Sequence, residues 1–164
     1  MKNSFSEAKK IFYDCYGSHF FIDREYGNIY KKYNVPKEIE NEWLNDIKNT
    51  LSYKIKTSHG SEQHRYVSYI CNILSSEESI DLLLSLLRTN TDSFTKLLYC
   101  EEAKRLLVTV ADDVKYNEIV EMIKEQKSLI LSDITNIDAD YKTLYYMKDY
   151  DFLPDNLIKR VEKL

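Results

Sequence analysis

Histidines are the side chains of this sequence best suited to acid–base or metal chemistry, and the chain has three of them. His59 and His64 stand five positions apart, so they do not share a helix face as the histidines of an HExxH zinc motif do. Glu62 lies between them and could join a metal site, but a loop histidine followed by a helical one is the simpler interpretation. The segment His19–Glu25 gathers an imidazole, two carboxylates and a guanidinium. Either the His59–His64 pair or the His19–Glu25 segment could line a catalytic or small-ligand pocket between helices.

The three cysteines form no recognisable motif. Cys15, Cys71 and Cys100 are widely spaced and odd in number, and no CxxC pair occurs. This usage is typical of buried free thiols in a reducing cytosol. The sequence also lacks a Walker motif, a glycine-rich phosphate loop, a GxSxG motif and a zinc cluster. It therefore favours a non-enzymatic protein without metal or cofactor, with a helical enzyme or a ligand- or metal-binding protein as the alternative.

Acidic and aromatic residues are mixed in the stretch from Asp138 to Asp155. Carboxylates can steer the approach of a basic protein, and tyrosines can supply the contacts that anchor it. The other interpretation is a packed, tyrosine-rich C-terminus with solvated Asp at the helix caps. The candidate binding residues for a basic protein partner are Asp138, Asp140, Tyr141, Tyr145, Asp149, Tyr150 and Asp151.

A second candidate surface is basic and aromatic. It consists of Tyr26, Tyr30, Lys31, Lys32 and Tyr33. Such residues can stack on bases and pair with phosphates, but two lysines are few and three glutamates surround them. The formal net charge of −4 also argues against general nucleic-acid affinity. We therefore predict no nucleic-acid partner.

Length and composition are those of one soluble helical domain. The chain has 164 residues, of which 43% are hydrophobic and 30% charged. Only three Gly and two Pro occur, which favours helices over an all-β fold with its many tight turns. The opening MKNSFSEAKK lacks the apolar run that a signal peptide needs, and no apolar run is long enough to span a membrane. We predict a cytoplasmic protein with no membrane partner.

The stretch Ser76–Ala111 holds the densest run of apolar residues and should form the core. Ser75 and Glu78 have the spacing of a capping box, which marks the start of a helix. Apolar residues then recur at i, i+3, i+4 and i+7, so one face of that helix should be buried. The residues on this face are Ile80, Leu83, Leu84 and Leu87.

Capping residues and periodicity predict the remaining elements. After the central helix, one helix should be capped by Thr91 or Asp92, and another should begin at Glu101. Toward the N-terminus we expect a helix over 5–16, an ordered loop over 18–35, and a helix from Pro36 to about residue 56. A hairpin with a Gly-Asn turn is the alternative for 18–35. Further helices are expected from Ser61, from Asp113, over 127–138 (where a short strand is the alternative), over 138–151 and from Pro154 to Leu164.

Residues 13–43, YDCYGSHFFIDREYGNIYKKYNVPKEIENEW, resemble the opening of small uncharacterised all-helical proteins of Gram-positive bacteria. The resemblance rests on the FFIDRE portion and on the helix start YNVPKEIE followed by Trp. It covers about a fifth of the chain. It implies a low-GC bacterial source and brings no known activity or site.

The sequence predicts an all-α protein, an irregular multi-helix bundle or a short α-solenoid of about eight helices, forming one domain over residues 1–164. Its predicted function is a cytoplasmic, non-enzymatic protein–protein interaction module, such as an antitoxin or toxin-immunity protein that binds a basic partner. The alternative is an enzyme, or a protein that binds a small ligand or metal, with an inter-helix pocket near His59 and His64 or in the His19–Glu25 loop. The oligomeric state is left open.

Overall fold

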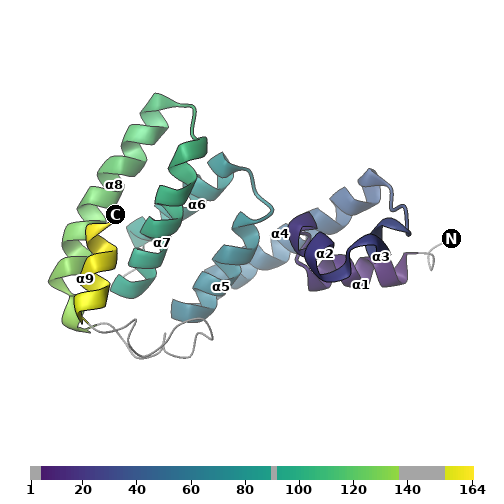
Figure 1. Ribbon diagram of the computed structural model, residues 1–164, viewed down its shortest axis with the longest axis horizontal. Coiled ribbons are helices and arrows are strands. Elements are labelled where there is room, and N and C mark those ends of the chain that lie inside the picture. Colours follow the sequence, from purple (N-terminus) through teal and green to yellow (C-terminus); the bar gives the residue numbers. More distant parts are fainter. Residues whose placement is uncertain (1–4, 90–91, 137–153) are drawn as a thin grey trace. The chain divides into compact units, whose positions relative to one another are not determined.

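The computed structural model describes residues 5–89, 92–136 and 154–164 (Figure 1). Every regular element in these ranges is an α-helix or a short 3₁₀ turn, so the prediction of an all-α protein is confirmed. No helix among the described residues is long and apolar enough to cross a membrane. The described elements are α1 Ser6–Asp14, α2 His19–Tyr26, α3 Asn28–Lys31, α4 Lys37–Thr57, α5 Gly60–Cys71, α6 Ser76–Thr89, α7 Ser93–Leu106, η1 Leu107–Thr109, α8 Asp113–Ser132, η2 Ile134–Asn136 and α9 Pro154–Glu162.

The chain groups into two compact units, which are described separately. The N-terminal unit comprises residues 1–58 and 66–73, and the C-terminal unit comprises residues 59–65 and 74–164. The first residues of α5 therefore belong to the C-terminal unit and the rest of that helix to the N-terminal unit. The expectation of a single domain stays a prediction.

Helix α4 supplies the apolar face on which the N-terminal unit is built. Apolar residues repeat every four positions along it, which brings them to one side of the helix. This face is buried and consists of Trp43, Ile47, Leu51 and Ile55. Helix α1 packs against α4 and α2 and buries Ala8, Ile11 and Phe12. Pro36 caps α4 rather than opening it, one position from the predicted start.

Residues 18–35 are largely helical, so the predictions of a loop or a hairpin for this segment are wrong. The chain forms α2 and α3, with Gly27 at φ +49° making the turn between them. Ser18 precedes α2 without a side-chain capping hydrogen bond. The two helices are instead held by burial of Ile22, 1% exposed, and Tyr30, 5% exposed. Short helices depend on tertiary packing more than on local signals, and local signals are weak here.

In the C-terminal unit, α6 begins with the predicted capping box. The amide of Ser75 donates to Glu78 Oε2 at 2.8 Å, and the amide of Glu78 donates to Ser75 Oγ at 3.2 Å. The predicted face of this helix is buried, with Ile80, Leu83, Leu84 and Leu87 each at most 3% exposed. Helix α7 contacts both α6 and α8, and these three helices lie side by side (Figure 1).

Helix α7 is one continuous helix, and the prediction of a new helix at Glu101 is wrong. Asp92 caps α7 as expected, because its carboxylate accepts from the Thr95 amide at 2.5 Å. Neither Gly nor Pro interrupts the sequence from there to Leu106, so nothing ends the helix. Glu101 acts in a tertiary contact instead, because both of its oxygens accept from the Arg160 guanidinium, at 2.9 and 2.7 Å.

The C-terminal unit is completed by α8 and α9. Helix α8 runs to Ser132, which confirms the helical interpretation of residues 127–132 and excludes a strand there. Asp112 caps it by accepting from the Lys115 amide at 2.8 Å. Helix α9 packs against α8 and buries Leu157 and Val161 completely. The helix predicted over 138–151 lies outside the described residues.

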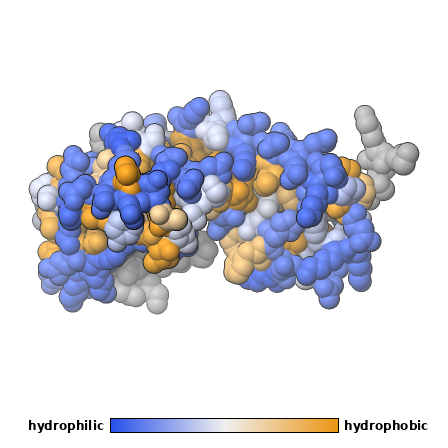
Figure 2. All heavy atoms as spheres, turned by 90° about the horizontal axis from the view of Figure 1, so that it is seen from above, coloured by the Kyte–Doolittle hydropathy of each residue, from blue (hydrophilic) through white to orange (hydrophobic). Residues whose placement is uncertain are grey.

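Charged and polar side chains cover most of the face drawn in Figure 2, and hydrophobic residues reach it in separate patches. Among the large apolar side chains most exposed in the described residues are Phe20, Tyr53, Val108 and Val114. Single exposed apolar residues are ordinary on soluble proteins. These positions therefore carry no functional argument by themselves.

Candidate functional site

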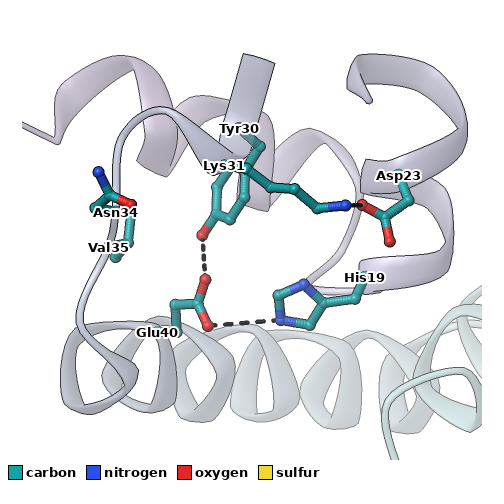
Figure 3. A pocket seen from close by; sticks show the side chains of 7 residues that line it. All are labelled: His19, Asp23, Tyr30, Lys31, Asn34, Val35 and Glu40. Atoms are coloured by element: carbon teal, nitrogen blue, oxygen red, sulfur yellow. Dashed lines mark hydrogen bonds and ion pairs between the residues drawn. The ribbon is translucent and has the colours of Figure 1, made fainter. Parts of the chain in front are cut away.

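A pocket of about 350 Å³ opens in the N-terminal unit between α2, α3 and the start of α4. Its volume is at the lower end of the range of about 300–1,000 Å³ found for small-ligand sites. Figure 3 shows its lining, in which two side chains converge on Glu40 and another reaches across to Asp23. The lining residues are His19, Asp23, Tyr30, Lys31, Asn34, Val35 and Glu40.

The turn between α1 and α2 places the first wall of the pocket. The Gly17 amide donates to the Phe12 carbonyl at 2.8 Å, which closes α1 in the manner of a Schellman motif. Tyr16 and Gly17 both have positive φ, +50° and +73°. The chain then reverses directly into α2, where His19 and Asp23 stand one turn apart and so share a face.

The return of the chain from α3 to α4 places the other wall. Asn34, at φ +44°, follows the single turn of α3 and turns the backbone toward Pro36 and α4. Asn is among the residues that tolerate this left-handed conformation. Glu40 then falls in the first turn of α4, where the positive end of the helix dipole favours a carboxylate.

The Glu40 carboxylate is the centre of the pocket. Tyr30 donates its hydroxyl to Glu40 Oε1 at 2.7 Å, and His19 Nε2 lies 3.5 Å from Glu40 Oε2 (Figure 3). Burial raises the pKa of Tyr30 well above its usual value, and the hydrogen bond to Glu40 and the charge of that carboxylate raise it further. Tyr30 therefore remains a neutral donor over the physiological pH range.

Aromatic rings support this hydrogen-bonded group from behind. The Phe12 ring centroid lies 6.1 Å from that of Tyr30, 6.0 Å from that of His19 and 5.6 Å from that of Trp43. Such offset and edge contacts fix the planes of the rings as well as burying them. Tyr30 is thus held by the core of the unit, whereas the His19 side chain is 62% exposed.

The mouth of the pocket is bounded by an exposed ion pair. Lys31 Nζ lies 3.1 Å from Asp23 Oδ1, and these side chains are 64% and 56% exposed. Glu40, by contrast, is only 18% exposed. The pocket therefore has a carboxylate withdrawn from solvent and a lysine at its rim. Chemically it can accept hydrogen bonds from a donor at Glu40 and offer a positive charge at Lys31.

The residues of the His19–Glu25 segment lie in two different environments. His19 and Asp23 line the pocket, whereas Arg24 and Glu25 pair with each other at 2.7 Å on the exposed side of α2. The Arg24 guanidinium also lies over the exposed ring of Phe20, 5.9 Å from its centroid. The segment is a helix, so the expected loop is corrected, but its imidazole and one carboxylate do reach a common cavity.

The other two histidines lie in the C-terminal unit and do not share an environment. His59 is exposed, whereas His64 is partly buried in α5 with its ring centroid 6.2 Å from that of Tyr99. Burial lowers the pKa of His64, against the opposing charges of Glu102 and Glu101. Among the described residues, no group of three or more His, Cys, Asp or Glu is arranged to hold a metal ion.

Several lining residues were not predicted as a site. Tyr30 and Lys31 were assigned to a basic-aromatic surface for nucleic acid, but Tyr30 is buried and bonded to Glu40, so its ring is not available for stacking on a base. Glu40 was not singled out: in the sequence it is one of the three glutamates around the basic-aromatic residues. The available signal was the pairing of Asn34 before Pro36, which indicates a turn that brings α3 back onto α4.

The candidate residues for a basic protein partner lie outside the described residues. They are Asp138, Asp140, Tyr141, Tyr145, Asp149, Tyr150 and Asp151. Their role stays a prediction from the sequence.

The cysteines of the described chain are free thiols, as predicted: Cys15 and Cys100 are buried, and Cys71 is partly exposed. Cys100 is fully buried, and this burial, with the nearby charge of Glu101, raises its pKa from 9.0 to about 12. A higher pKa lowers the thiolate fraction, and the thiolate is the reactive form.

We expect Cys100 to resist thiol reagents in the folded protein at pH 8. In a Cys15→Ala/Cys71→Ala variant, 5,5′-dithiobis(2-nitrobenzoate) should titrate this thiol quickly only after unfolding in guanidinium. Above pH 9 the unfolded chain loses the thiol proton first, so this group should lower the free energy of unfolding progressively as pH rises from 9 toward about 12. Equal reaction rates for folded and unfolded protein would contradict the buried position.

Comparison with known proteins gives no match: no protein-family model matches the chain, and no curated protein or solved structure is significantly similar to it. The resemblance of residues 13–43 to small helical proteins of Gram-positive bacteria therefore stays a prediction.

Proposed function

We propose that the protein is a non-enzymatic protein–protein interaction module of the cytoplasm that binds a basic protein, in the manner of an antitoxin or toxin-immunity protein. The proposal rests on the uneven distribution of acidic and basic residues along the sequence. Residues 138–155 contain five Asp and two Lys, a formal charge of −3, out of a formal net charge of −4 for the whole chain. The remaining residues carry 22 acidic and 21 basic side chains.

Some charges of the described helices are paired with one another. Examples in the C-terminal unit are Arg88 with Glu118, at 2.5 Å, and Lys115 with Asp81, at 2.8 Å. Because acidic and basic residues nearly balance outside residues 138–155, most of the excess negative charge lies in that stretch of sequence. A concentrated charge attracts a partner of opposite sign and speeds its association, more strongly at low salt. Four tyrosines in the same stretch can supply anchoring contacts.

The test replaces Asp149 and Asp151 with Lys. The tagged wild-type protein should retain a basic protein from the native cell lysate at low salt and release it at high salt. The double variant should lose this retention, because it reverses two charges in the stretch that we propose as the binding surface. Far-UV circular dichroism should show unchanged helix content.

A charge-matched control is available on α8. Glu121→Lys/Glu125→Lys makes the same change in net charge at exposed positions of that helix, and it should keep the partner. Loss of retention in both variants would show that only the total charge matters, and retention by the Asp149→Lys/Asp151→Lys protein would rule out the acidic stretch. An immunity-type role further predicts that the captured protein is toxic when expressed alone and tolerated when this chain is co-expressed.

A further inference from the structure

Among the ion pairs of the described residues, the pocket carboxylate has no partner with a permanent positive charge. Glu40 pairs there with His19, which is charged only when protonated, while Tyr30 donates as a neutral hydroxyl. A carboxylate that is 18% exposed is partly desolvated, which favours a cationic group that reaches it. A carboxylate accepts about four hydrogen bonds, so capacity remains beyond these two partners.

The rim of the same pocket offers the opposite charge. Lys31 is held by Asp23 in an ion pair whose two side chains are both more than half exposed. Exposed pairs of this kind are worth about 0–1 kcal/mol. The Lys31 ammonium can therefore exchange Asp23 for the anionic group of a ligand at little cost.

The lining is not purely polar, because Val35 and the ring of Tyr30 also belong to it. Figure 3 shows Tyr30 beside Lys31, and Val35 on the far side of Tyr30 from the Lys31–Asp23 pair. The pocket thus offers an acceptor at Glu40, apolar surface at Tyr30 and Val35, and a cation at Lys31 on its rim. A ligand that matches these groups carries an ammonium and an anion on one small skeleton.

We propose that this pocket binds a small zwitterion with a primary ammonium and a carboxylate, that is, a free amino acid or a close analogue. The ammonium donates to Glu40, and the ligand carboxylate accepts from Lys31 Nζ. Val35 and Tyr30 contact the carbon skeleton. This ligand site uses none of the residues of the acidic stretch 138–155, so a negative result for one proposal leaves the other untouched.

The experiment uses the full chain and titrates it with each of the twenty common amino acids by calorimetry, with the fluorescence of Trp43 as a second signal. Trp43 is the only tryptophan and packs against Phe12, which in turn contacts Tyr30. For each amino acid that binds, two derivatives are measured: the amide, which lacks the carboxylate, and the N-acetyl form, which lacks the ammonium. Both derivatives should bind at least about ten-fold more weakly, since each loses one charged hydrogen bond.

Two variants assign the two charges to the two residues. Lys31→Ala should weaken the amino acid about ten-fold and leave the amide unaffected, whereas Glu40→Gln should weaken both. Glutamine keeps an acceptor for Tyr30, so this variant should fold. Lys32→Ala is the matched control, because Lys32 is exposed on the neighbouring position and does not line the pocket.

The measurements can also contradict the zwitterion proposal. If an amine or amide bound as tightly as the amino acid, the ligand would be a simple cation rather than a zwitterion. This result would overturn the proposal. Equal binding by the N-acetyl derivative, or by the Lys31→Ala protein, would also overturn it. No binding of any of the twenty amino acids at millimolar concentration would do the same.

Discussion

Replacing Phe94 with Ala is expected to lower the free energy of unfolding of the C-terminal unit by about 3–5 kcal/mol. Phe94 is fully buried on α7, the helix that contacts both α6 and α8. The substitution leaves a cavity that close-packed neighbours cannot fill. It also removes the ring beneath the Arg160 guanidinium, which lies 5.4 Å from the ring centroid. Guanidinium denaturation followed by circular dichroism measures the loss.

The chain provides a control of the same residue type. Phe20 is 70% exposed on α2, so Phe20→Ala should change the free energy of unfolding by no more than about 0.5 kcal/mol. Similar losses for both variants would mean that Phe94 does not lie in a packed core.

The sequence predicted the long amphipathic helices well because burial there follows a simple period. Apolar residues at four-residue spacing place Trp43, Ile47 and Leu51 on one face of α4, and that face is buried. The start of α6 could also be predicted from the sequence, because the Ser75–Glu78 capping box is a local interaction between residues three positions apart. These features need no knowledge of the rest of the fold.

The errors arose where tertiary contacts decide the local structure. Helix α2 is short and is anchored chiefly by Ile22, a signal too sparse to recognise as a helical period. The acidic pair Glu101–Glu102 resembles a helix start, yet Glu101 stands in the middle of α7, where its carboxylate meets Arg160, 59 positions later. No local rule reports a partner that far along the chain.

The sequence named the His19–Glu25 segment as one possible position for a pocket, but the partners that α3 and α4 supply there could not be predicted, for the same reason. The central contacts of the pocket join His19 and Tyr30 to Glu40 across 21 and 10 positions. They exist because two turns with positive φ, at Gly17 and Asn34, fold the α2–α3 segment back onto α4. Residue types identified His19 as chemically capable, but only the turns determine which carboxylate it meets.

Gly17 is the position where this dependence on a turn can be measured. At φ +73°, an Ala at this position adopts a backbone conformation that costs an L-residue about 1–2 kcal/mol. Its Cβ would also stand 2.7 Å from Leu44 Cδ1, so this side chain must shift, and 3.2 Å from Phe12 Cε1, a tight contact. Together with overpacking of about 1–3 kcal/mol, Gly17→Ala should lower the free energy of unfolding by about 2–5 kcal/mol, measured by the fluorescence of Trp43 in the same unit.

A double-mutant cycle separates the two causes. Leu44→Ala removes the side chain that the new Cβ would meet, so the double variant Gly17→Ala/Leu44→Ala should be more stable than the sum of the single losses predicts. The free energy of unfolding that Gly17→Ala still costs in the Leu44→Ala background measures the backbone strain. Strict additivity would show that no clash with Leu44 occurs. A neutral Gly17→Ala substitution would contradict the positive φ itself, and with it the turn that starts α2 and brings His19 and Asp23 to the pocket.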